Sequence, residues 1–183
     1  MSRDNSLKGM VYASLFGAAT AAAAYLSVPM VPVPFTLQTL VLMLSAAFLG
    51  PRLGALSQVI YLLLGIMGLP VFAGGKAGLG VVTGPTGGYL IGFIPAAAAV
   101  GYLVWARRAP GFWWLVLSMA VGTLIVYVLG VFQLAISRDF GPAKAVAVGA
   151  LPFLPGDALK IVAAAVLAGR LRRAIRFSGR EQG

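Results

Sequence analysis

Runs of apolar residues, most of them long enough to cross a lipid bilayer, dominate this chain. A transmembrane helix needs about 20 such residues, because the hydrocarbon core is about 30 Å thick and each helical residue rises 1.5 Å. Turn-forming prolines and glycines divide the chain into six predicted spans, at 9–27, 36–50, 53–70, 87–106, 112–137 and 155–174. Only 10% of the residues are charged, against about 25% in a soluble domain. We therefore predict an all-α integral membrane protein with a single transmembrane domain over residues 1–183.

The basic residues predict the orientation of these spans, since cytoplasmic loops of membrane proteins are enriched in Lys and Arg. With six spans and a cytoplasmic N-terminus, most bases fall inside: Arg3, Lys8, Arg52, Arg107, Arg108, Arg170, Arg172, Arg173, Arg176 and Arg180. Lys76, Arg138 and Lys144 fall outside, and the roles of Arg138, Asp139 and Lys144 stay open. We expect both termini, as short tails, on the cytoplasmic side of a prokaryotic cell membrane. The polar and glycine-rich stretches, at 28–36, 70–89 and 138–157, then face outward.

The composition excludes several kinds of chemistry. The net charge of +10 comes from bases that flank apolar runs, which is typical of membrane topology rather than of nucleic-acid binding. The chain has no Cys and no His, so thiolate metal sites and Cys/His or Ser/His nucleophiles are absent. Gly75-Lys76 resembles the end of a phosphate-binding loop, but Ala77 stands where Ser or Thr is needed. We expect no enzyme, no metal, no cofactor and no ATPase site in this chain.

Asp157 and Lys160 are the clearest candidates for a functional site. They lie three residues apart at the start of the last apolar run and share a helix face. Ionisable groups at membrane depth usually pair with one another or meet a polar ligand. The alternative is structural: Asp157 interacts with the helix dipole, and Lys160 is its partner. Thr36, Gln38 and Thr39 add polar groups near the outer end of the second run.

Two further features have two interpretations each, and a third has one. The outer stretch 70–85 either folds over a small molecule as a lid or is a flexible connector. Ala18 and Ala22 in the first run form a small-xxx-small face, which serves either packing within the monomer or docking to another membrane subunit. Gln58 and Gln133 are isolated on apolar segments and are expected to form hydrogen bonds between helices.

Five motifs together resemble one known family. They are VPFTLQT at 33–39, LGPRLGA at 49–55, GLPVFAGG at 68–75, GPTGGY at 84–89 and PFLPGDALK at 152–160. In this order they resemble the BioY proteins, the biotin-specific substrate-binding (S) components of energy-coupling factor (ECF) transporters. The resemblance extends over residues 7–173, and the segment around Arg138, Asp139 and Lys144 is less family-like.

The resemblance implies a six-helix subunit that captures biotin from outside with high affinity. Energy for uptake would come from partners: a transmembrane coupling protein (T component) and two cytoplasmic ATPases. The face made by Ala18 and Ala22 looks like the motif that contacts the coupling protein. A homo-oligomer and function without the full module both stay open.

Biotin offers ureido N–H groups, a carbonyl, a sulfur-containing ring and a carboxylate, and these suggest roles for the candidate residues. We expect Asp157 to accept from the N–H groups and Gln38 or Lys160 to serve the carbonyl. The carboxylate is expected at Lys76 or at the backbone N–H groups near Thr86 and Gly87. The remaining ligand-binding candidates are Thr36, Phe35 and Tyr89, the two aromatic rings packing against the ligand ring. The opposite pose, with the carboxylate on Lys160, is the alternative.

Two other functions are alternatives to such a subunit. A self-sufficient carrier would use a proton or sodium gradient, with Asp157 as its titrating group. A small membrane enzyme would use Asp157 as an acid or base, but the sequence offers no second catalytic group.

Overall fold

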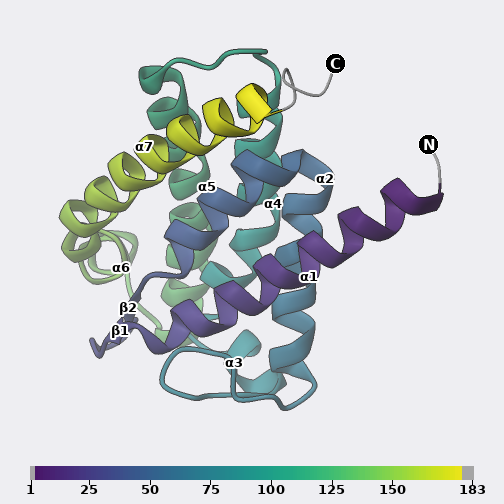
Figure 1. Ribbon diagram of the computed structural model, residues 1–183. Helices are drawn as coiled ribbons and strands as arrows, with labels where there is room; N and C mark the ends of the chain where they lie inside the picture. The colour runs from purple at the N-terminus through teal and green to yellow at the C-terminus, as the bar shows by residue number, and fades with distance from the viewer. Residues whose placement is uncertain (1–2, 179–183) are drawn as a thin grey trace.

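The computed structural model describes residues 3–178, and its side chains are described over 7–170. The long helices form a bundle, and a two-stranded hairpin lies at one end (Figure 1). The elements in chain order are α1 (Arg3–Tyr25), β1 (Ser27–Val28), β2 (Phe35–Thr36), α2 (Gln38–Ile66), α3 (Leu79–Thr83), α4 (Gly87–Trp105), α5 (Phe112–Arg138), α6 (Pro142–Gly149), the 3-10 turn η1 (Leu151–Phe153) and α7 (Leu154–Ser178). Arg180, which belongs to the predicted basic tail, lies outside the described residues.

Within residues 3–178, five helical stretches are long and apolar enough to cross a membrane. They are Leu7–Tyr25, Gln38–Ile66, Gly87–Trp105, Phe112–Arg138 and Pro142–Arg170. The prediction of a helical membrane protein is therefore confirmed. The count differs from the predicted six because α2 corresponds to two predicted spans, 36–50 and 53–70.

Helix α2 reverses direction at the predicted break. Gly50 has φ 81° and ψ −174°, a conformation that only glycine adopts easily, and Pro51 follows it. A Cβ added at Gly54 would lie 2.8 Å from the Cα of Ala46. In a continuous helix these two positions would be about 12 Å apart. The chain therefore runs along one arm and returns along a second arm to α3, as Figure 1 shows.

Two predicted outer stretches contain structure that the sequence did not indicate. The stretch 138–157 contains α6 and η1, and Pro142 stands in the first turn of α6, where its missing N–H costs nothing. In the stretch 70–85, Phe72 and Lys76 form an antiparallel bridge and α3 follows. We call residues 70–85 the covering loop.

The two ends of the bundle differ in character. The strands, the covering loop, α3 and α6 gather at one end, which we call the hairpin end, whereas the described start of α1 and end of α7 lie toward the other (Figure 1). At that opposite end the Trp105 indole donates to the carbonyl of Ala47 at 3.1 Å. The Arg107 guanidinium lies 3.7 Å from the ring centroid of Trp114. The polar elements and the basic, aromatic α4–α5 turn thus occupy opposite ends.

Candidate functional site

A cavity of about 770 Å³, its mouth included, lies at the hairpin end. The walls come from β2, α2, α3, α4, α5, η1, α7 and the covering loop. Most of the lining is apolar, and the residues with polar side chains are Thr36, Gln38, Thr39, Lys76, Thr86, Tyr89, Thr123, Tyr127, Asp157 and Lys160. The cavity thus brings together eight of the nine predicted ligand-binding residues.

Asp157 and Lys160 form a buried ion pair in the wall of this cavity. Helix α7 begins at Leu154, so Asp157 lies in its first turn, where the helix dipole favours a negative charge. Lys160 follows one turn later on the same face, and its Nζ lies 2.8 Å from Asp157 Oδ1. Each residue is only 6% exposed. The geometry confirms that the two side chains share a face and pair.

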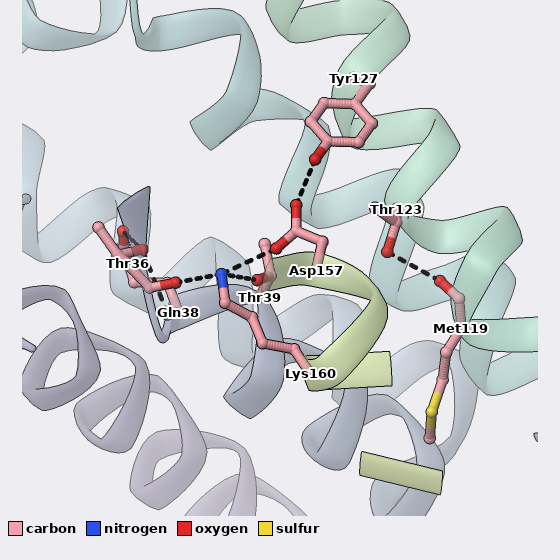
Figure 2. Close-up of polar contacts among 8 residues, drawn as sticks. All are labelled: Thr36, Gln38, Thr39, Met119, Thr123, Tyr127, Asp157 and Lys160. Atoms are coloured by element: carbon pink, nitrogen blue, oxygen red, sulfur yellow. Dashed lines mark hydrogen bonds and ion pairs between the residues drawn. The ribbon is translucent and has the colours of Figure 1, made fainter. Parts of the chain in front are cut away.

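The hydrogen-bonding capacity of Lys160 is fully used. Its Nζ donates to the carbonyl of Thr36 at 2.5 Å, to Thr39 Oγ1 at 3.2 Å and to Asp157 Oδ1 (Figure 2). An ammonium has three N–H groups, so each has an acceptor. The same Nζ lies 3.6 Å from the ring centroid of Phe35. The cation is therefore fixed between α2, β2 and α7.

Asp157 retains capacity to accept more hydrogen bonds. Its Oδ2 accepts from the hydroxyl of Tyr127 on α5, and its Oδ1 accepts from Lys160 (Figure 2). A carboxylate offers about four lone-pair positions, so these two bonds leave about two. In this pair, Asp157 is thus the group that can accept N–H donors from a ligand without losing a bond.

Gly156 explains why the ring of Phe35 lies beside Lys160. A Cβ at position 156 would lie 2.3 Å from Phe35 Cζ, so the ring packs directly on the backbone of α7. On the same wall Phe35 is stacked with Phe153, with centroids 6.2 Å apart and planes inclined by 2°. The glycine between Pro155 and Asp157 is therefore part of the site.

A second network fixes the polar side chains of β2 and α2. The Thr36 hydroxyl donates to Gln38 Oε1 at 2.9 Å, and Gln38 Nε2 donates to the hydroxyl of Tyr61. Gln38 is 3% exposed and Tyr61 is fully buried. These bonds hold Gln38 in the cavity wall with one N–H of its amide still available.

The covering loop is an ordered part of the site. Phe72 is 1% exposed, lines the cavity and packs on Gly65, where an added Cβ would lie 2.1 Å from its Cζ. On the other side Gln133 Nε2 of α5 donates to the carbonyls of Val82 and Gly84, at 2.8 and 2.7 Å. Gln133 therefore joins α5 to α3 and the loop. These contacts favour the lid over the flexible connector.

The remaining candidates fall into two groups. Tyr89 and Thr86 line the cavity, and the Tyr89 hydroxyl donates to the carbonyl of Gly149 at 2.8 Å, which leaves its ring toward the cavity. Lys76 also lines it and is exposed. Gly87 does not line the cavity: its N–H donates to the Gly84 carbonyl at 3.1 Å, and an added Cβ would lie 1.7 Å from Val82 O. Gly87 permits close packing, and its N–H is not free for a carboxylate.

Helix α1 presents Ala18 and Ala22 on an exposed face. On its inner side, Gln58 Nε2 donates to Thr20 Oγ1 at 3.4 Å and to Ser45 Oγ at 3.3 Å. The first of these bonds joins α1 to α2, which confirms the helix–helix role expected of Gln58. The predicted docking face thus points away from the bundle.

Sequence reasoning missed several residues of the cavity. Tyr127 is the most important, because it binds Asp157 from a helix that supplies no predicted site residue. Its hydroxyl within an apolar span was the available indication, since such a group needs a partner. Phe72 and Phe153 lay within the quoted motifs without an assigned role. Thr123 donates to its own helix at Met119 O, 3.0 Å (Figure 2), and nothing in the sequence distinguishes it.

Comparisons with known proteins agree in family and in fold. A protein-family model described as the BioY family matches residues 1–177. A biotin transporter BioY from Thermotoga maritima is 44% identical over 168 residues, covering 91% of this chain and 97% of the relative. A biotin transporter BioY from Rhizobium etli is 38% identical, covering 88% and 91%. The crystal structure of the S-component for biotin from an ECF-type ABC transporter matches with a TM-score of 0.85 and 27% identity, covering 94% of this chain and 95% of that one.

Proposed function

This chain belongs to the BioY family, and from that premise we propose that it is the biotin-binding membrane subunit of a vitamin uptake transporter. The observation that carries the proposal is the buried Asp157–Lys160 pair in the wall of this cavity. A transporter subunit needs such a site to hold a polar ligand within the membrane.

The pair is complementary to a ureido group. A ureido ring presents an N–H donor directly beside a carbonyl acceptor, and the pair presents a carboxylate 2.8 Å from an ammonium. Asp157 accepts the ligand N–H groups at its unused positions, whereas Lys160 meets the carbonyl only by exchanging one of its present bonds. The 3.2 Å bond to Thr39 is the longest of these. A carboxylate at Lys160 would meet Asp157 as well, so the pose with the ureido group at the pair is favoured.

The other parts of biotin then follow from the shape of the cavity. The bicyclic ring packs against the aromatic side chains of Phe35 and Tyr89, and Gln38 and Thr36 also line the cavity. The flexible chain extends toward the mouth, where Lys76 supplies a cation for the carboxylate. The covering loop closes over the ligand, and its buried Phe72 side chain points inward from the loop.

The arrangement of the chain in the membrane is part of the proposal. We place the hairpin end outside and both termini in the cytoplasm, with the two arms of α2 as separate spans, giving six in a multi-pass protein. The exposed Ala18 and Ala22 face then contacts a membrane coupling protein, and two cytoplasmic ATPases supply the energy. The chain itself needs no cofactor, and self-association is compatible with this arrangement.

Biotin calorimetry on detergent-purified protein tests the proposal. Wild type is expected to bind biotin, and Asp157→Asn is expected to lose about 10- to 150-fold in affinity, the value of one or two charged hydrogen bonds. Asp139→Asn is the matched control, because Asp139 is exposed and lies outside the cavity lining. A well-folded wild type that does not bind biotin would contradict the assignment.

A second variant separates binding from folding. Breaking a buried pair by removing one partner costs about 3–5 kcal/mol, whereas replacing both partners by apolar residues is often neutral. Asp157→Leu with Lys160→Met should therefore melt close to wild type and still fail to bind biotin. If cells that lack the ATPases still took up biotin, and if this uptake depended on an ion gradient, a self-sufficient carrier would be favoured instead.

A further inference from the structure

A second hollow lies at the hairpin end, next to the cavity. Its lining residues are Pro32, Lys76, Ala77, Gly80, Val81, Gly84, Pro85, Thr86 and Arg138. Lys76, Val81 and Thr86 line both spaces, so the covering loop and the start of α4 form the boundary between them. We call this hollow the vestibule.

The vestibule is basic. Its lining includes the cations Lys76 and Arg138 and no carboxylate. Among the side chains that the structure describes, neither of these cations forms an ion pair. Asp139 follows Arg138 in sequence, but it lies in the left-handed turn that ends α5 and does not line the vestibule. An anion in the vestibule therefore meets two cations from separate elements.

The position of these cations is unusual for a membrane protein. The hairpin end has three basic residues with described side chains, Lys76, Arg138 and Lys144. The proposed orientation places this end outside the cell, and outer short loops of membrane proteins are poor in Lys and Arg. Lys144 lies over the ring of Phe140, 4.2 Å from its centroid, and outside the vestibule. The other two converge on one hollow beside the ligand cavity, which indicates a role beyond topology.

We propose that Arg138, together with Lys76, makes the vestibule a receiving site for the carboxylate of an anionic ligand and selects the acid over its neutral derivatives. The inference rests on the proposed function, in which biotin enters the cavity with its carboxylate toward the mouth. A guanidinium suits this task because it stays charged and offers paired N–H groups to a carboxylate. Arg138 is exposed, so its effect falls mainly on the association rate and weakens with salt.

The test compares association rates of biotin and neutral biotinamide by stopped-flow, at low and high salt. At low salt, Arg138→Gln is expected to slow biotin association by about threefold, the effect of one unit charge a few ångströms away in water. High salt should remove the difference, and biotinamide should associate with both proteins at the same rate. Arg138→Lys should retain most of the effect. Lys144→Gln is the matched control and should behave as wild type.

Two outcomes would overturn the inference, and they differ from a failure of the proposed function. In the first, Arg138→Gln associates with biotin as fast as wild type. In the second, Arg138→Gln slows the association of biotin and of biotinamide equally. In both cases wild type still binds biotin, so the proposed function stands. Absence of biotin binding by wild type would instead overturn the proposed function and this inference with it.

Discussion

Replacing Gly156 by alanine should damage biotin binding while changing the stability of the protein little. The added Cβ would lie 2.3 Å from Phe35 Cζ, whereas ordinary contacts begin at 3.4 Å, so the ring must move by about 1 Å. Phe35 is stacked on Phe153 and lies beneath the Lys160 ammonium. Moving Phe35 also moves the adjacent Thr36 carbonyl, which accepts a bond from Lys160.

The two effects on stability oppose each other. Overpacking costs about 1–3 kcal/mol, and exchanging Gly for Ala in a helix returns about 1 kcal/mol. The free energy of unfolding should therefore fall by about 0–2 kcal/mol. Biotin affinity should fall at least about tenfold, since the displaced ring and carbonyl both belong to the site and 1.4 kcal/mol is a factor of ten.

Gly169→Ala is the control within the same helix. Among the side chains described over 7–170, a Cβ at this position meets only Leu115 Cδ1, at 3.7 Å, which is an ordinary contact. The substitution should raise the melting temperature slightly and leave biotin affinity unchanged. Calorimetric titration and a thermal melt of both variants make the comparison. Wild-type affinity in Gly156→Ala, or an equal loss in Gly169→Ala, would refute the reasoning.

Three further substitutions test other contacts. Gly65→Ala would place a Cβ 2.1 Å from Phe72 Cζ, so we expect the covering loop to loosen. Biotin should then dissociate roughly tenfold faster in stopped-flow. An unchanged dissociation rate would contradict the role of Phe72 in holding the loop over the ligand. Tyr89→Phe removes the bond to the Gly149 carbonyl, and denaturation should show a loss of about 1 kcal/mol while the ring keeps binding within about threefold. Gln58→Leu should leave the melting temperature unchanged or raise it, because Gln58 Oε1 is buried without a hydrogen-bond partner in the described part of the chain; a large drop would show that its amide is needed.

The features that the sequence predicted well are those set by local chemistry. Gly50 followed by Pro51 predicted a break in the second apolar run, since glycine permits the positive φ and proline begins the next arm. Asp157 and Lys160 were predicted to share a face because helical spacing alone determines this. Neither inference needed knowledge of a distant part of the chain.

The features that it missed depend on contacts between distant residues. Tyr127 and Asp157 are 30 positions apart in sequence. Their hydrogen bond forms because α5 packs against α7, which local sequence does not reveal. Gly87 was expected to offer its N–H to a carboxylate, but the turn from Gly84 takes that N–H. Whether a backbone group near a helix start is free depends on the path of the preceding loop, which local sequence rules do not determine.

The packing beyond the cavity constrains how a bound ligand can leave toward the cytoplasm. A Cβ at Gly101 of α4 would lie 2.6 Å from the backbone of Gly50 in α2, and one at Gly122 of α5 would lie 2.4 Å from Val100 Cγ2. At these two contacts the helices leave no room for one additional methyl group, so the packing there cannot widen by side-chain rotation alone. Under the proposed function, we therefore expect inward delivery of biotin to involve a movement of helices and not of side chains alone. In the proposed arrangement, the exposed α1 face with Ala18 and Ala22 is a surface that the coupling protein can contact without disturbing the cavity.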